Sequence, residues 1–273
     1  MPFPPKYWSL AGVCLLVFAG LASGEAGLWP LDAFDRAITD AVPGLRSEFL
    51  NLLMLAVTAL GDSRFLIFVA CVTIFALLAA RAWREAILFG VAFATMPLIV
   101  KLLKLTIARP RPTVDLYGGV ESFSFPSGHA TNAALIYGAL ALLALSVFRK
   151  LPGRMIAAAF TLLAVMVAVS RVYLGAHWPS DTFAGLALAG LGLVIISAIQ
   201  DTLRLPGECV AWPVGSEIDT RRRALHPGRA GPDHRSLSAL SPAHPSGSAG
   251  ALHSPAQRLG SPRSGKHANR RAC

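Results

Sequence analysis

The chain has 273 residues, of which 54% are hydrophobic and only 15% are charged, a composition outside the range of soluble globular domains. Its net charge is +10, and +6 of this follows residue 200, where eleven Lys and Arg stand against five Asp and Glu. The apolar residues form long unbroken runs rather than helical stripes or strand alternation. This pattern predicts membrane-spanning helices and excludes a soluble enzyme fold.

Six apolar runs are each close to the twenty residues with which a helix crosses a bilayer. A shorter run, Phe49 to Leu60, is too brief to span and ends at Gly61-Asp62, so we interpret it as an interfacial or re-entrant helix. The predicted fold class is all-α: a six-transmembrane helical bundle with a short interfacial helix after the first span. The predicted spans are 8–24, 64–81, 85–103, 130–148, 154–170 and 182–199.

The first run also fits a signal peptide, because Lys6 precedes it and the small residues Ala22-Ser23-Gly24 end it. In both cases the chain emerges on the far side of the membrane. The later orientation follows from the basic residues of two short loops, which the positive-inside rule places in the cytoplasm. These residues are Arg81 and Arg84 in one loop, and Arg149, Lys150 and Arg154 in the other.

The chain divides into a membrane-embedded domain, 1–200, and a basic tail, 201–273. From about Pro206 the tail is rich in Pro, Ser, Gly, Ala, His and Arg, without the apolar periodicity that a packed core requires. We therefore expect it to be disordered and, from the loop charges, cytoplasmic. No nucleic-acid motif accompanies its basic residues, so we expect contact with anionic lipid rather than with nucleic acid.

A first polar cluster leaves the third predicted span, on the face that should be poor in cations. Lys104 is followed by Arg109 and by Arg111-Pro112. Arginine binds two phosphate oxygens through its planar fork and lysine adds a point charge, so the pair suits a compact polyanion. Either cation alone would be explained by snorkelling at a helix end.

A second cluster, Ser122 to His129, directly precedes the fourth span. Pro126 and Ser127 are favoured at a helix start, which would present backbone N–H groups to an anion. Gly128 lets a ligand approach the backbone closely, and His129 lies one step inside the helix. The sequence therefore predicts a phosphate site with a proton donor beside it.

The third cluster connects the fifth and sixth spans. Arg171 adds a cation to the same face, and His177 and Asp181 are four residues apart. A helical turn beginning near Pro179-Ser180 would place the carboxylate against one imidazole nitrogen and leave the other free to attack. Helix capping or an outer salt bridge is the structural alternative. Several unpaired charges near hydrocarbon would be costly, however, so pairing or a ligand is expected.

Taken in order, the three clusters resemble the three-part signature of the type 2 phosphatidic acid phosphatase superfamily, over about residues 50–200. The resemblance implies attack on phosphorus by His177, with Asp181 hydrogen-bonded behind it, and protonation of the leaving group by His129. It implies neither a metal nor a cofactor, and the four cysteines lack metal-ligand or disulfide spacing. The residues implied to hold the phosphate oxygens are Lys104, Arg111, Ser127, Gly128 and Arg171.

The membrane spans select an amphiphilic substrate with its phosphate at headgroup depth. We expect a lipid phosphate or diphosphate, such as undecaprenyl diphosphate, phosphatidylglycerol phosphate or phosphatidate, cleaved at the periplasmic face of a bacterial inner membrane. A phosphotransferase with the same histidine is an alternative. A lipid transporter or a non-catalytic lipid-phosphate binder is the alternative outside the enzymes. A transporter is disfavoured because the last three spans carry no ionisable residue at their centres. The oligomeric state stays open.

Overall fold

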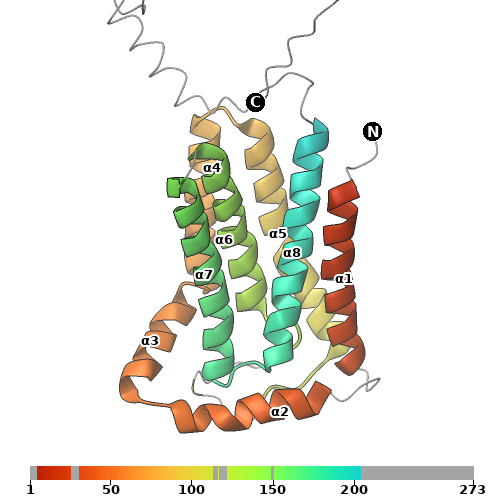
Figure 1. Cartoon of the computed structure of the whole chain (residues 1–273), viewed down its shortest axis with the longest axis vertical. Coiled ribbons are helices and arrows are strands. Elements are labelled where there is room, and N and C mark those ends of the chain that lie inside the picture. The colour runs from red at the N-terminus through yellow and green to blue at the C-terminus, as the bar shows by residue number, and fades with distance from the viewer. Residues whose placement is uncertain (1–4, 26–30, 113–115, 117–121, 149–150, 204–273) are drawn as a thin grey trace, which may run out of the picture. The chain divides into compact units, whose positions relative to one another are not determined.

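A computed structural model of the chain describes residues 5–25, 31–112, 116, 122–148 and 151–203. This part of the chain is helical, as the sequence predicts, and most of its helices run alongside one another in a bundle (Figure 1). The elements are α1 (Pro5–Glu25), α2 (Leu31–Ala41), the short 3₁₀ helix η1 (Val42–Leu45), α3 (Glu48–Ala59), α4 (Ser63–Ala79), α5 (Trp83–Ile107), α6 (Gly128–Val147), α7 (Leu151–Tyr173) and α8 (Pro179–Leu203).

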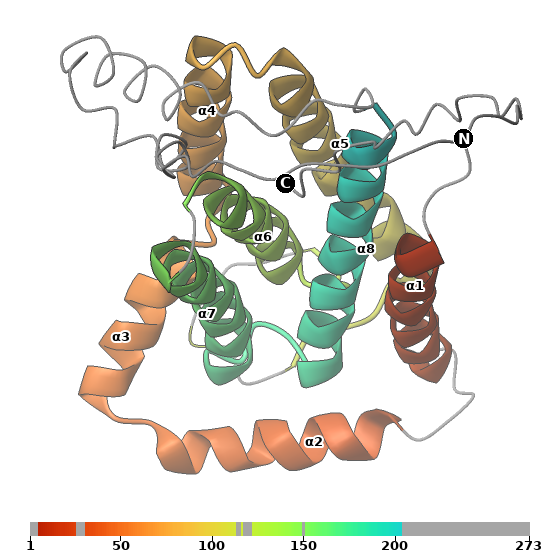
Figure 2. The same ribbon diagram turned by 45° about the horizontal axis from the view of Figure 1, so that its top comes forward.

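Helix α6 lies at the centre of the bundle and packs against both α7 and α8, while α1 covers α8 (Figure 2). In the main apolar core, α6 packs against α4, α5, α7 and α8, which contribute buried residues such as Leu66, Phe89 and Val167. Small residues permit this close packing. A Cβ at Gly185 of α8, for example, would lie 2.8 Å from Thr131 Oγ1 of α6.

Many large apolar side chains are exposed on the outside of the bundle, among them Leu16, Phe75 and Leu102, as expected of a surface that faces lipid. Within the described residues, five helices are long and apolar enough to cross a membrane: α1, α5, α6, α7 and α8. Helices α3 and α4 are bent by 46° at a short break, and together they would supply the sixth crossing. The all-helical fold is confirmed. The run Phe49 to Leu60, predicted to lie outside the spans, forms α3, which with α4 makes either a broken span or a re-entrant segment, and α4 is not a candidate span without it.

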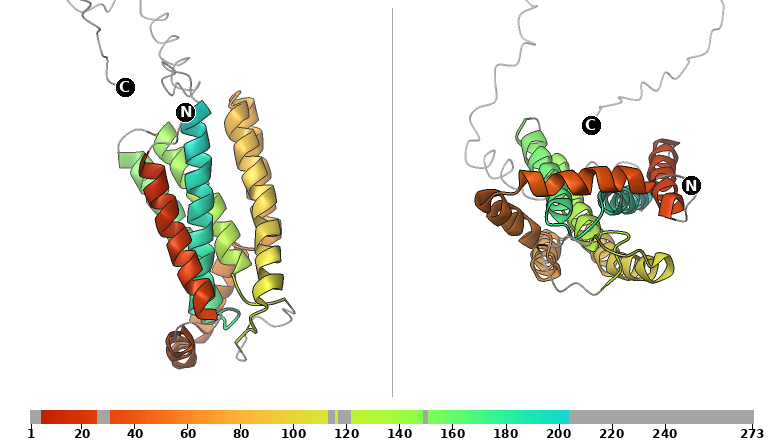
Figure 3. Two further views of the ribbon diagram at one scale, coloured as in Figure 1. Left: turned by 90° about the vertical axis from the view of Figure 1, so that its right-hand side faces the viewer. Right: turned by 90° about the horizontal axis from the view of Figure 1, so that it is seen from below.

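Helix α2 was not predicted. It lies across the ends of α7 and α8 and runs from the side of the bundle where α1 lies to the side where α3 lies (Figures 1 and 3). Its buried face carries Leu31, Asp35 and Thr39 at four-residue spacing, whereas Asp32 and Arg36 form an exposed i,i+4 pair. Two of the three inward residues are polar, so a search for apolar runs does not find this helix.

Two sequence predictions concern residues outside the described ranges. One is the predicted orientation, which rests in part on Arg149 and Lys150. The other is the predicted tail, except that residues 201–203 form the end of α8.

Candidate active site

The three polar clusters meet at one end of the bundle, the lower end in Figure 1. This end holds the last turn of α5, the first turn of α6 and the turn that joins α7 to α8. Arg111 Nη1 from the first cluster lies 3.3 Å from His177 Nε2 of the third. The backbone N–H of Ser127 from the second cluster donates to the carbonyl of Asp181. Residues more than fifty positions apart thus form one site.

His177 lies in the tight α7–α8 turn. Gly175 has a positive φ of 76°, and the carbonyl of Arg171 accepts from the N–H groups of Ala176 and His177. Asp181 falls in the first turn of α8, so its Oδ2 reaches to 3.3 Å from His177 Nδ1. The predicted arrangement of these two side chains is therefore present, with both buried.

The contacts of the His177 ring define its tautomer. A guanidinium can only donate, so Nε2, which faces Arg111, is the acceptor. The proton then lies on Nδ1, directed at Asp181. Burial lowers the pKa of His177 to about 3, although the hydrogen bond with Asp181 acts in the opposite direction. The ring is consequently neutral at ordinary pH, with its Nε2 lone pair toward the cations.

Ser124 completes the surroundings of the Asp181 carboxylate. Its hydroxyl donates to Asp181 Oδ2 and lies 3.3 Å from His177 Nδ1, and the backbone N–H of Trp178 donates to the same carboxylate oxygen. Ser124 lies within the second cluster, Ser122 to His129, but the sequence analysis assigns it no role. Its contact with Asp181 depends on the packing of this loop against the α7–α8 turn, which buries Ser124 completely.

Lys104 and Arg111 bind to the loop that precedes α6. Lys104 Nζ donates to the carbonyls of Phe123 and Ser124. Arg111 donates to the carbonyl of Ser122 through Nε and to the carbonyl of Ala176 through Nη1. The two cations therefore lie beside His177, as the sequence analysis predicts, and they tie all three clusters together.

The N-terminus of α6 has the predicted form. Ser127 is the N-cap, with its side chain accepting from the N–H of Ala130, and the helix begins at Gly128. His129 lies at the contact with the α3–α4 junction, since a Cβ at Gly61 would be 3.3 Å from its ring. Its electrostatic neighbours include Arg171, Arg111 and Lys104. The last two also act on His177, so both histidines share these cations.

Arg171, in the last turn of α7, is 1% exposed. Its Nη1 donates to the hydroxyl of Thr58, which belongs to α3, at 2.9 Å. A cation this deeply buried needs fixed partners. Helix α3 therefore contributes a residue to the site, which its apolar sequence alone did not indicate.

A second group of residues that the sequence analysis did not assign lies behind Asp181. Arg109 Nη1 donates to Asp181 Oδ1, and Arg109 Nη2 donates to Asp35 Oδ2 of α2, each at 2.7 Å. Arg109 was noted only as one cation of the first cluster. An acidic residue on the inward face of an amphipathic helix is the signal that would have pointed to Asp35.

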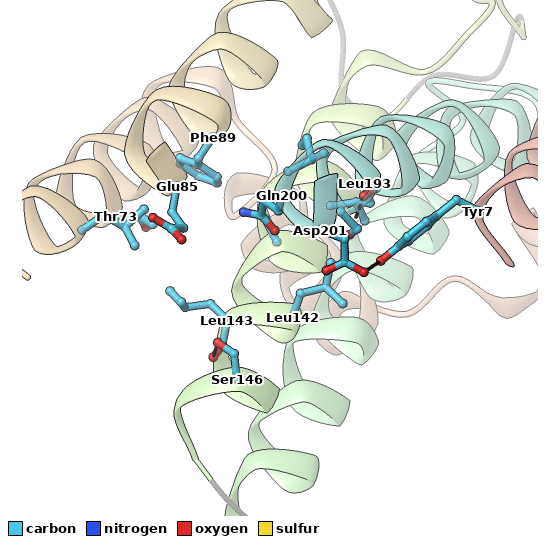
Figure 4. Close-up of a pocket in the computed structure, with 14 residues that line it drawn as sticks. Tyr7, Thr73, Glu85, Phe89, Leu142, Leu143, Ser146, Leu193, Gln200 and Asp201 are labelled. Carbon is cyan, nitrogen blue, oxygen red and sulfur yellow. Dashed lines mark hydrogen bonds between the residues drawn. The ribbon is translucent and has the colours of Figure 1, made fainter. Parts of the chain in front are cut away.

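No group of three or more His, Cys, Asp or Glu with the geometry of a metal site occurs among the residues that the structure describes. A cavity of about 260 Å³ lies at the other end of the bundle, where Glu85, Gln200, Asp201 and Tyr7 project into it (Figure 4). Tyr7 Oη donates to Asp201 Oδ2 there. This cavity includes none of the residues of the three clusters.

Known proteins are similar to this chain over most of its length. Residues 85–205 match the family model of the PAP2 superfamily. Phosphatidylglycerophosphatase B of Bacillus subtilis is 32% identical over 194 residues, covering 70% of this chain and 96% of the relative. Lipid A 1-phosphatase of Rhizobium etli is 34% identical over 215 residues, covering 68% of this chain and 82% of the relative.

A solved structure resembles this one. The crystal structure of a transmembrane PAP2-type phosphatidylglycerolphosphate phosphatase from Bacillus subtilis superposes with a TM-score of 0.64 at 31% identity, over 71% of this chain and 97% of the other. The resemblance seen in the sequence is confirmed. The chain belongs to the PAP2 superfamily and is a membrane-integral phosphatase of that family.

Proposed function

We propose that this protein hydrolyses the phosphate of a membrane lipid through a phosphohistidine formed on His177. The observation that carries the proposal is the orientation of that ring. Its Nδ1 is held by Asp181, while Nε2 faces Arg111 within a group of cations. A neutral imidazole fixed in this tautomer is a competent nucleophile toward a phosphorus atom placed among those cations.

In the proposed reaction, Nε2 forms a bond to phosphorus as the bond from phosphorus to the leaving oxygen breaks. The ring becomes positively charged, and Asp181 stabilises this charge through the proton on Nδ1. His129, which takes up a proton when the negatively charged phosphate binds beside it, donates that proton to the leaving oxygen. In the second half, His129 removes a proton from water, which attacks phosphorus and releases inorganic phosphate and neutral His177.

The nonbridging phosphate oxygens would be held by fixed positive groups. Lys104 and Arg111 lie beside His177, and Arg171 is an electrostatic neighbour of His129. The N-terminus of α6 adds the Ser127 cap and the N–H of Gly128, where the helix dipole favours an anion. These groups would stabilise the transition-state charge without a metal.

The substrate we propose is a lipid phosphomonoester or diphosphate. The relatives are named for phosphatidylglycerophosphate and for the 1-phosphate of lipid A. Both are lipids with a phosphate at headgroup depth, and the apolar surface of the bundle would keep the site at that depth. Phosphatidylglycerol phosphate, phosphatidate and undecaprenyl diphosphate form the candidate set. From the loop charges, we place the site on the periplasmic face of a bacterial inner membrane and the tail in the cytoplasm.

The test is a phosphate-release assay of purified protein in detergent, with each of these three lipids, in the presence of EDTA. We expect activity that EDTA does not lower and that His177→Ala reduces by at least a thousandfold. His226→Ala, which changes a histidine of the predicted tail, is the matched control. Full activity of His177→Ala would refute the nucleophile. A newly phosphorylated acceptor in place of free phosphate would establish phosphotransfer instead of hydrolysis.

A further inference from the structure

Behind the proposed nucleophile lies a buried group of three charges, Asp35, Arg109 and Asp181, with exposed fractions of 1%, 7% and 0%. Charged side chains this deep are costly unless they are paired and hydrogen-bonded. The group is well satisfied, because Arg109 bridges the two carboxylates at 2.7 Å on each side. The ring of Trp178 also packs 5.3 Å from the guanidinium carbon.

Asp35 is bound by the active-site turn on several sides. Its Oδ1 accepts from the backbone N–H of Ser180 at 2.9 Å, and its Oδ2 accepts from the Ser180 hydroxyl and from Arg109 Nη2. Ser180 directly precedes Asp181, so Asp35 holds both the backbone that carries Asp181 and the guanidinium that binds it. Helix α2 is thereby fastened to the turn that positions the proposed nucleophile.

The two oxygens of Asp181 have different partners. Oδ2 contacts His177, Ser124 and the N–H of Trp178, whereas Oδ1 accepts from Arg109. A carboxylate with donors on both oxygens cannot rotate without losing hydrogen bonds. Arg109 therefore fixes the plane of the carboxylate that orients His177.

The charges of the group also matter. Arg109 alone would neutralise Asp181, but Asp35 adds a second carboxylate, so that the three side chains together carry one negative charge. That charge lies behind His177, which becomes positively charged as it attacks phosphorus. In a buried site with few mobile charges, such a fixed charge acts more strongly than it would in water.

From these contacts we infer that Asp35 and Arg109 are positioning residues for the reaction: through them, α2 fixes Asp181 and leaves one negative charge behind His177. The inference rests on the proposed function. A purely structural role for Asp35 and Arg109 makes a different prediction. Loss of a structural anchor would affect folding and the whole site together, whereas loss of this charge slows the chemical step and leaves substrate binding unchanged.

The experiment compares Asp35→Asn with Asp32→Asn on the same helix. Asn preserves the shape of Asp35 and removes its charge. Asp32 pairs with Arg36 at 3.8 Å on the exposed face and is the matched control. We expect Asp35→Asn to lower kcat by 10- to 100-fold with KM within threefold of the parent protein, and Asp32→Asn to leave both within twofold. Single-turnover formation of phosphohistidine should slow by the same factor as kcat.

Any other pattern for Asp35→Asn, such as unchanged kcat or a raised KM, overturns the inference. If Asp35→Asn does not fold, Ser180→Ala takes its place, because it deletes only the hydroxyl between Arg109 and Asp35. A kcat of Ser180→Ala within twofold of the parent overturns the inference, and a fall of three- to tenfold at constant KM supports it. His177→Ala is measured in parallel. If it is active, the proposed function fails, whereas an inactive His177→Ala with fully active Asp35→Asn refutes the positioning role alone.

Discussion

Replacement of Thr58 by valine tests whether α3 belongs to the active site. Valine has nearly the shape of threonine but lacks the hydroxyl that accepts from Arg171 Nη1 at 2.9 Å. Both residues are 1% exposed, so water cannot readily replace the lost acceptor. A hydrogen bond to a charged group contributes about 1.5–3 kcal/mol. If this loss falls on the transition state, kcat/KM drops by about 10- to 150-fold.

The assay is phosphate release in detergent, with two further variants as controls. Thr58→Ser retains the hydroxyl and should recover most of the activity. Thr73→Val removes a buried hydroxyl of α4 that donates to the carbonyl of Val69 in its own helix, and it should keep kcat/KM within twofold. If Thr58→Val is as active as Thr73→Val, the contact with Arg171 has no part in catalysis and the reasoning is wrong.

Two further predictions concern packing and protonation. Gly185→Ala should lower the midpoint of thermal unfolding and the activity, because its Cβ would lie 2.8 Å from Thr131 Oγ1 and overpacking costs about 1–3 kcal/mol. Gly90→Ala, with its nearest neighbour at 3.6 Å, should change neither, and equal behaviour of the two variants would contradict this account. Because burial lowers the pKa of His177 to about 3, its neutral form should persist on acidification well below the usual imidazole range. In NMR spectra of protein with ¹³C-labelled histidine, the signal of His177 is the one that disappears in His177→Gln. This signal should not titrate between pH 5 and 8, and a midpoint near 6.5 would refute the burial argument.

Much of the site could be predicted because its chemistry is encoded locally. Ser127 and Gly128 mark a helix start by their own preferences, and four-residue spacing in a helical turn is enough to bring Asp181 to His177. The spans follow from the solvent that surrounds them, since a lipid-facing helix must be apolar along its length. The number of predicted spans between the clusters also predicted that all three lie on one membrane face, because the chain changes side at every crossing.

The support of the site was decided only by the tertiary structure. Thr58 and Arg171 are 113 positions apart, and Asp35 and Ser180 are 145 apart. No local preference encodes such contacts, because they arise from how α2 and α3 pack against the ends of α7 and α8. The sequence by itself determined that the chain is a bundle of apolar helices with three polar clusters, from which the residues that bind and attack a phosphate are predicted. Which buried partners hold those residues depended on helix packing, since a charge inside the bundle is stable only where another segment brings its counter-charge or hydrogen-bond partner.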